Sequence, residues 1–331
     1  MKKHSILRTV FLASVCLLII LGICSCNTTQ EDAASTEAKY FKVTFNSLGG
    51  SEVSEQRVLE NEKISCPDAP VRDGYVFEHW EHAGKEWSFS YDKVTEDITL
   101  VASWIDASQV YEHRQADGIN GKYITGCKQF FASMPIPSAI DGIPVIGIDD
   151  GAFADVDSET VQKIILPSSV TAIGNNAFKG CADIEIVVNG ALTLIGESAF
   201  EGCSGLSAIK LGNELDNLPF NAFKECTALK HVVLPSSLTL ISENAFEDCS
   251  SLAYIVMHSN TVTVEDNAFG GCTNLKTVYY HGTQAQLDEI SIATSNSPLT
   301  DANYFFYSKD EPAEAGAYWR YDENGKIKLW T

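Results

Sequence analysis

Five cysteines recur at nearly equal intervals through the middle of the chain, and thiols can do more kinds of chemistry than any other side chain in this region. Aligned thiols can form disulfides, bind a metal or pack as small apolar side chains. Because the column has an odd number of members and occupies a leucine-like phase, we expect free, buried thiols. A disulfide within the column is the alternative, and a metal or redox role is a further one. The members are Cys181, Cys203, Cys226, Cys249 and Cys272.

A histidine pair beside two glutamates is the second candidate for chemistry. His79 and His82 lie three residues apart, next to Glu78 and Glu81. This spacing aligns metal ligands on a helix, whereas glycines on both sides of the segment favour a strand end and a turn. We therefore expect exposed polar residues and no metal site here.

Motifs and charge exclude several function classes. The sequence contains no nucleophile elbow, zinc motif, phosphate loop, dinucleotide fingerprint or EF-hand loop, so we expect neither an enzyme nor a cofactor. Its 331 residues include 44 acidic and 23 basic side chains, which give a net charge of −21. Such a chain repels phosphate backbones, so nucleic acid is excluded as a partner.

The first segment indicates export. Three basic residues flank an uncharged apolar run that ends at Cys26. A basic start before a short apolar stretch is typical of signal peptides, and the sequence I-C-S-C resembles the lipobox of bacterial lipoproteins. The resemblance implies removal of residues 1–25, lipidation of Cys26 and a polar tether over 26–39, with the membrane bound through the lipid. An uncleaved membrane helix is the alternative.

Residues 40–105 have the pattern of a small all-β unit. Short segments with alternating apolar and polar residues are separated by Gly-Gly and Asp-Gly turn dipeptides. The order V-T-F-N-S-x-G-G, P-V-R-D-G-Y-x-F-x-x-W and I-T-L-x-A-x-W resembles the internalin-B-type B-repeat of bacterial surface proteins. A unit this small needs large side chains to fill its core. We expect that core to contain Trp80, Trp87 and Trp104.

An Ala-Phe dipeptide then recurs at intervals of 22 to 25 residues. A unit this short cannot bury its own apolar face, so neighbouring units must stack into a solenoid. We expect the I-K-L or V-V-L segment of each coil to pair with the next coil in a parallel sheet. The phenylalanines are Phe153, Phe178, Phe200, Phe223, Phe246 and Phe269.

The repeated unit resembles the BspA-like leucine-rich repeat family, whose pattern is A-F-x-x-C-x-x-L-x-x-I-x-L-P-x-S-L-x-x-I. The predicted fold is mainly β, a leucine-rich repeat solenoid with a parallel sheet on its concave face and short helices or turns on the other. We expect a cap and first repeat at 106–151, the solenoid at 152–282 and a C-terminal cap at 283–331. The coil after Cys181 is one residue short.

Aromatic and imidazole side chains gather at outward positions of the predicted sheet, near its C-terminal end. This composition is typical of protein interfaces, so the group is our candidate ligand-binding patch. The alternative is that such residues merely suit strands and that the cap covers them. Two histidines on adjacent rungs leave open a weak metal or pH response. The patch comprises His231, Tyr254, Val256, His258, Tyr279 and His281.

The family resemblance implies adhesion, and that step is an analogy with the family. We expect a lipid-anchored protein of the bacterial cell envelope, at its outer surface, that binds a protein or glycan of a host or of other microbes. One alternative is an envelope scaffold that packs against neighbouring surface proteins. Another is a surface lipoprotein that captures glycans.

Overall fold

The computed structural model describes residues 38–258, 262–313 and 316–330. The predicted signal peptide at 1–25 and the predicted lipidation site Cys26 lie outside these residues, so both stay predictions. Within the described ranges, no helix has the length and apolar character needed to cross a bilayer.

The N-terminal module is one mixed five-stranded sheet with its own core. Its strands lie in the order β2-β1-β5-β3-β4, and only β1 and β5 are parallel. Trp80 is 2% exposed, and Trp87 and Trp104 pack against the same cluster, which confirms the expected tryptophan core. The strands are β1 (Tyr40–Asn46), β2 (Gln56–Leu59), β3 (Tyr75–His82), β4 (Lys85–Glu86) and β5 (Ile98–Asp106).

A short helix and a side-chain clamp join the module to the solenoid. The helix, α1 (Ala107–Val110), follows β5 directly. The Asp73 carboxylate accepts two hydrogen bonds from Ser138, one from the main-chain N–H at 2.8 Å and one from the hydroxyl at 2.6 Å. Val76 of β3 is fully buried in the solenoid core. The module and the first coils therefore share a core as well as a covalent connection.

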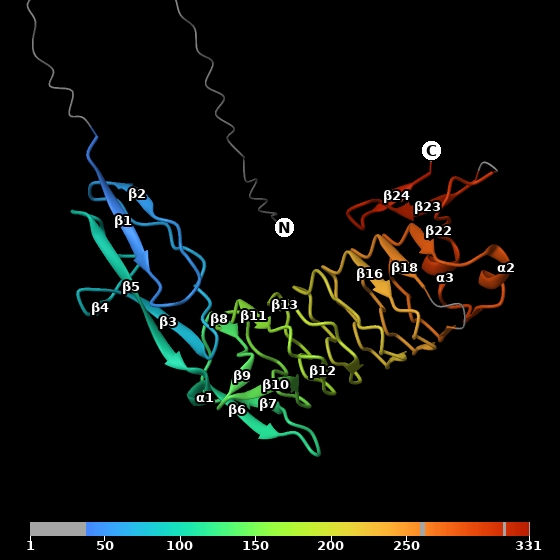
Figure 1. Ribbon diagram of the computed structural model, residues 1–331, viewed down its shortest axis with the longest axis horizontal. Coiled ribbons are helices and arrows are strands. Elements are labelled where there is room, and N and C mark those ends of the chain that lie inside the picture. The colour runs from blue at the N-terminus through green and yellow to red at the C-terminus, as the bar shows by residue number, and fades with distance from the viewer. Residues whose placement is uncertain (1–37, 259–261, 314–315, 331) are drawn as a thin grey trace, which may run out of the picture. The chain divides into compact units, whose positions relative to one another are not determined.

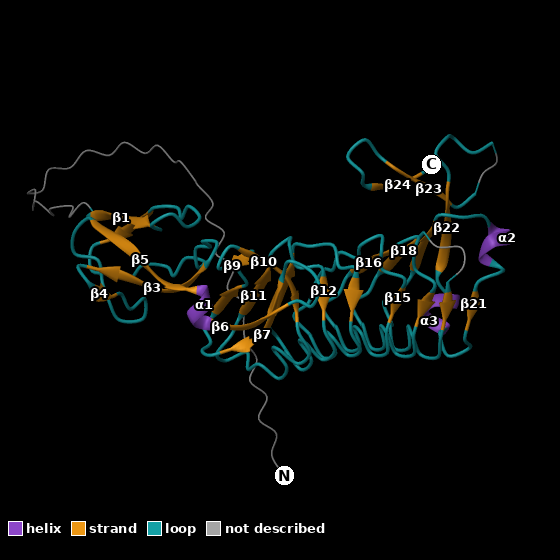
Figure 2. Cartoon of the chain, turned by 60° about the horizontal axis from the view of Figure 1, so that its bottom comes forward, coloured by secondary structure: helices purple, strands orange, loops and turns teal. Residues whose placement is uncertain are grey.

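Stacked coils form the solenoid, and most of them contribute one strand to a wide parallel sheet and one to a narrow parallel sheet (Figures 1 and 2). The wide sheet has mostly four-residue strands, and Lys163 lies opposite Glu185, as the repeat register predicts. The narrow sheet has mostly two-residue strands, and an antiparallel hairpin, β6–β7, closes its N-terminal end. The wide-sheet strands are β8 (Ser133–Pro135), β11 (Lys163–Leu166), β13 (Glu185–Val188), β16 (His231–Leu234), β18 (Tyr254–Met257) and β20 (Thr277–Tyr280). The other strands are β6 (Tyr111–Gln115), β7 (Lys122–Cys127), β9 (Ala139–Ile140), β10 (Ile143–Ile148), β12 (Ala172–Ile173), β14 (Leu194–Ile195), β15 (Asn217–Leu218), β17 (Leu240–Ile241), β19 (Thr263–Val264) and β21 (Ser291–Ile292).

The phenylalanine column forms an uninterrupted stack through the core. All six rings are at most 1% exposed, neighbouring centroids lie 5.2 to 5.4 Å apart, and the ring planes differ by 6 to 18°. The rings lie close to parallel because each coil repeats the backbone of the one before it. The Ala-Phe period thus places one ring per coil in a continuous core, as expected.

One position in each of five coils has a left-handed backbone. It lies two residues before the phenylalanine, and its φ is between 53 and 59°. Asparagine fills four of the five positions, because its short polar side chain tolerates this region better than most residues do. The sequence carries this signal as N-A-F. The residues are Asn176, Ser198, Asn221, Asn244 and Asn267.

Both sheets are interrupted at one place, where the expectation of a continuous sheet is wrong. In the wide sheet, residues 207–210 form no strand, so β13 and β16 belong to different sheets. In the narrow sheet, β14 and β15 do not pair with each other. A space of about 360 Å³ lies between β13 and residues 207–210. The preceding coil is the shortened one, and Leu211 bridges to Leu192 instead of pairing with β13.

A close approach beside the gap helps to explain it. A Cβ on Gly205 would lie 2.1 Å from the carbonyl oxygen of Ile184, so the two coils nearly touch there. They part directly afterwards, at Ser207 and Ala208, which have little preference for strands.

The C-terminal segment continues the wide sheet. β22 (Asn303–Tyr307) pairs in parallel with β20, and β23 (Tyr318–Tyr321) and β24 (Ile327–Leu329) follow at the edge. The fully buried Trp319 donates its indole N–H to the Tyr280 carbonyl at 3.2 Å. Two one-turn helices precede these strands, α2 (Gln284–Leu287) and α3 (Ser297–Thr300).

We expect Phe223→Ala to lower the free energy of unfolding by about 3–5 kcal/mol, because it removes a fully buried ring with neighbours on both sides. Urea unfolding followed by circular dichroism measures the change. Phe220→Ala is the matched control, since that ring is 41% exposed and its loss should cost far less. Equal losses would contradict the stacked core.

Candidate ligand-binding surfaces

The six residues of the predicted patch lie together on the outward side of the wide sheet. The His231 ring stacks on Tyr254 with centroids 5.0 Å apart, and Tyr254 meets Tyr279 edge-on at 5.5 Å. His258 and His281 lie on adjacent rungs, with centroids 5.1 Å apart. The repeat register therefore brings these side chains together as the sequence indicated.

The C-terminal strands pack over the far half of this patch. Val256 is only 1% exposed although it occupies an outward position. Tyr279 contacts Phe305 and Trp319, with ring centroids 5.8 and 5.6 Å apart, and His281 stacks on Tyr307 at 4.0 Å. The more accessible part of the sheet face lies toward the middle of the solenoid, where Val233 is 43% exposed.

The two patch histidines are held by protein groups. His258 Nδ1 lies 3.1 Å from the Leu234 carbonyl oxygen, and its Nε2 lies 3.3 Å from the Tyr321 hydroxyl. Burial lowers the pKa of His281, and the positive charge that His258 can carry lowers it further. Across the described residues, no group of three or more histidine, cysteine or acidic side chains has the arrangement of a metal site.

The histidine pair of the module lies on a strand, as expected. His79 and His82 both belong to β3. His79 Nε2 lies 3.1 Å from a Glu81 carboxylate oxygen, and His82 Nδ1 lies 3.3 Å from the Thr99 carbonyl oxygen. Each ring thus has a partner within the module's own sheet.

The five column cysteines are free thiols and fully buried. Each Sγ lies 3.0 to 3.2 Å from the carbonyl oxygen of the phenylalanine one coil earlier, to which the thiol donates. Burial raises the pKa of Cys181 to about 12 and that of Cys226 further. These thiols are therefore structural hydrogen-bond donors, in agreement with the expectation of free, buried groups.

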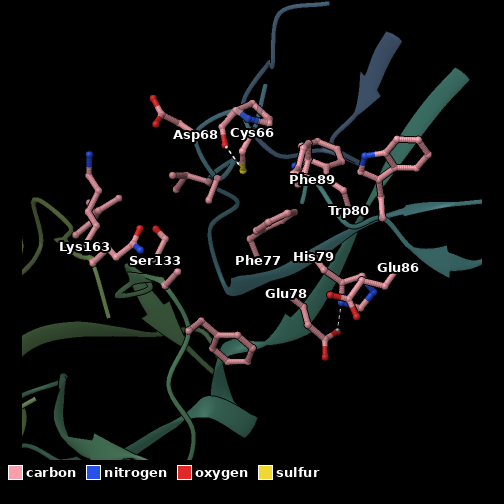
Figure 3. Close-up of a pocket in the computed structure, with 18 residues that line it drawn as sticks. Cys66, Asp68, Phe77, Glu78, His79, Trp80, Glu86, Phe89, Ser133 and Lys163 are labelled. Atoms are coloured by element: carbon pink, nitrogen blue, oxygen red, sulfur yellow. Dashed lines mark hydrogen bonds and ion pairs between the residues drawn. The ribbon is translucent and has the colours of Figure 1, made fainter. Parts of the chain in front are cut away.

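A cavity of about 480 Å³, the junction pocket, opens where the module meets the first coils (Figure 3). The module supplies Phe77 and Glu86, and the wide sheet supplies Ser133, Lys163 and Ile165. Lys163 and Ile165 are outward residues of β11, so the pocket is continuous with the sheet face. Sequence reasoning missed it, because no local pattern shows how the module docks on the solenoid.

Comparison with family models finds two matches. Residues 146–276 match the BspA type leucine rich repeat region in six copies, and residues 41–103 match the Listeria-Bacteroides repeat domain. Both matches fall on the segments whose repeats and aromatic residues had indicated such modules, and they confirm the two resemblances.

Two curated proteins from Evansella cellulosilytica, one named a Gly-rich membrane protein and the other a membrane protein, are similar over 74 residues. They are 36% and 35% identical to this chain over that stretch. The stretch is 22% of this chain but only 9% and 11% of the two relatives, so the chain matches a small part of their length.

Solved leucine-rich repeat structures are also similar. A T. pallidum leucine rich repeat protein is 29% identical with a TM-score of 0.46, over 52% of this chain and 84% of its own. One from Bacteroides ovatus is 28% identical with a TM-score of 0.45, over 51% and 45%. A leucine rich cell surface protein from Faecalibacterium prausnitzii is 22% identical with a TM-score of 0.41, over 66% and 59%.

We expect the protein to lose stability as pH rises above about 8.5, the ordinary pKa of cysteine. The unfolded chain then releases thiol protons that the folded chain retains, because folding raises the pKa of Cys181 to about 12. Between pH 8 and 10 each such thiol should cost about 2 kcal/mol. Urea unfolding at both pH values measures this cost, and Cys181→Ala should show a smaller loss than the unchanged chain.

A thiol count separates free cysteines from the disulfide alternative. In the native protein Cys66, the exposed cysteine of the described chain, should react with maleimide first. All five column thiols should react after unfolding without reductant. If two of the five column thiols fail to react under these conditions, they are joined in a disulfide.

Acid should weaken the C-terminal end of the sheet. The pKa of His281 is lowered in the folded chain, so the unfolded chain binds this proton first and stability falls as pH drops below about 6.5. His281→Phe preserves the stacking on Tyr307 but cannot titrate. Its free energy of unfolding should fall less between pH 7 and 5 than that of the unchanged protein, and identical pH profiles would contradict this role.

Proposed function

We propose that this chain, in which a Listeria-Bacteroides repeat domain precedes a BspA-type leucine-rich repeat region, is a bacterial cell-surface protein that binds other macromolecules noncovalently. The solenoid presents the partner-binding face, and the module lies at its N-terminal end. Lipid attached to Cys26 holds the chain to the membrane, as the lipobox-like sequence indicates. The chain binds its partners without catalysing a reaction.

The observation that carries this proposal is the accessible middle of the sheet face. Val233 is exposed there, next to the stacked pair His231 and Tyr254, which remain half-buried, and Lys210 is exposed in the preceding coil, which forms no strand at this position. Apolar and aromatic side chains beside a charged one are typical of interface cores and their rims. A rigid solenoid also loses little conformational entropy when it binds, because its backbone is already ordered.

The partner class favoured by the family resemblance is a protein of the host matrix or of another microbe. A glycan is the second class, because half-buried aromatic rings at a surface also suit sugar faces. Whole cells that display the chain should bind immobilised fibronectin or collagen if the chain is an adhesin. Binding confined to a glycan array would assign it to glycan capture, and failure in both assays would favour an envelope scaffold.

Removal of the stacked pair tests the sheet face directly. We expect His231→Ala combined with Tyr254→Ala to reduce cell adherence at least fivefold, because the change removes two neighbouring rings while the core stays intact. Surface plasmon resonance with the purified protein gives the same comparison without cells. Phe220→Ala, an exposed aromatic residue outside the wide sheet, is the matched control. Unchanged adherence in a folded double variant would reject the sheet face as the binding surface.

Protease treatment of intact cells tests the location. Solenoid peptides should appear in the supernatant if the chain is displayed outside. Their protection, with release only after lysis, would reject the surface role.

A further inference from the structure

We propose that the junction pocket binds a lysine or arginine side chain within a segment of a partner protein. This inference rests on the proposed function, since it requires a protein partner, but it assigns that contact to a different surface. The patch lies at the C-terminal end of the sheet face, whereas the junction pocket lies at the N-terminal end.

The size and walls of the pocket suit a long side chain with an apolar stem. Its volume of about 480 Å³ is within the range of ligand sites. Phe77 and Phe89 come from the module, and Ile165 comes from β11 on the opposite wall. Figure 3 shows Phe77 between Ser133 on one side and Trp80 on the other. Apolar walls of this kind pack against the methylene groups of lysine or arginine.

The charge around the pocket favours a cation. The lining carries three carboxylates and one lysine, together with His79, which lies 4.0 Å from Glu78; the carboxylates are Asp68, Glu78 and Glu86. That lysine, Lys163, is already paired with Glu185 at 3.0 Å. Within the described chain, neither Asp68 nor Glu86 forms an ion pair. An arriving ammonium or guanidinium group therefore meets unpaired negative charge, and the aromatic rings add cation–π attraction.

The position of the pocket on the sheet face favours a segment of a bound protein over a small cation. Lys163 and Ile165 line the pocket and are outward residues of β11. A partner segment that lies on this face would place a basic side chain into the pocket. The neighbouring strand β8 does not offer a free edge, because Met134 is fully buried, Pro135 has no N–H, and the Pro135 carbonyl accepts the Tyr111 hydroxyl at 3.0 Å.

The test uses the purified chain and two synthetic peptides. Isothermal titration calorimetry should detect binding of acetyl-Lys-Phe-Lys-Phe-Lys-amide and no binding of acetyl-Glu-Phe-Glu-Phe-Glu-amide. Asp68→Asn combined with Glu86→Gln should weaken binding of the basic peptide at least fivefold. Glu159→Gln combined with Glu214→Gln removes the same charge from exposed positions outside the pocket and should leave binding unchanged. Equal binding of both peptides, or equal weakening by both double variants, would overturn the proposal.

Cys66 provides a second readout, because it lines the pocket and is exposed. Bound basic peptide should slow its alkylation by maleimide, and an unchanged rate would place the peptide elsewhere. Ala132→Phe, which adds bulk at an exposed lining position, should abolish peptide binding in a folded protein. Binding of butylamine as strongly as the peptide would overturn the assignment to a protein segment.

These measurements stand apart from the adherence assay. If the His231 and Tyr254 double variant loses adherence but still binds the basic peptide, both surfaces are supported. If the unchanged protein adheres but does not bind the basic peptide, only the junction pocket is rejected.

Discussion

The contact between one coil and the next is the interaction on which the rest of the structure depends. In each contact a phenyl ring lies against the ring of the preceding coil, and a thiol donates to the carbonyl of that coil's phenylalanine. The ring excludes water, and the thiol gives the carbonyl a second hydrogen bond across the coil boundary. The Phe200 carbonyl, for example, accepts the Cys203 N–H of its own coil at 3.1 Å and the Cys226 thiol of the next coil at 3.2 Å. Leucine at the cysteine position would supply apolar volume but no donor, which gives a physical reason for the recurrence of cysteine.

The repeat made much of the solenoid predictable from sequence. The phenylalanines from Phe153 to Phe269 recur with a period too short for each coil to have its own core. The coils must therefore stack, and stacking equivalent positions gives the register of β11 with β13. The interruption at 207–210 was not predictable in the same way. A one-residue shortening and two residues of weak strand preference decide it, and both are small against the strong Ala-Phe signal.

The surfaces were less predictable than the core because they depend on contacts between distant segments. Tyr279 and His281 lie on the predicted outward side of the sheet, yet the C-terminal strands pack on both of them after an intervening stretch with two short helices. The junction pocket is lined by both the module and the first coils, which Asp73 and Ser138, 65 residues apart, also connect. A local pattern describes a strand's two faces but does not describe what later packs on them.

The gap after β13 divides the sheets of the solenoid into an N-terminal part and a C-terminal part. Main-chain ladders run on either side of it in both sheets, while the ring stack and the Phe178 carbonyl bond to Cys203 continue across it. Main-chain hydrogen bonds also cross on both sides of the gap, from the Phe178 N–H to the Ala199 carbonyl and from the Gly212 N–H to the Leu192 carbonyl. The core is therefore continuous where the sheet face is divided, and a ligand that spans both halves of that face must cross a hollow of about 360 Å³.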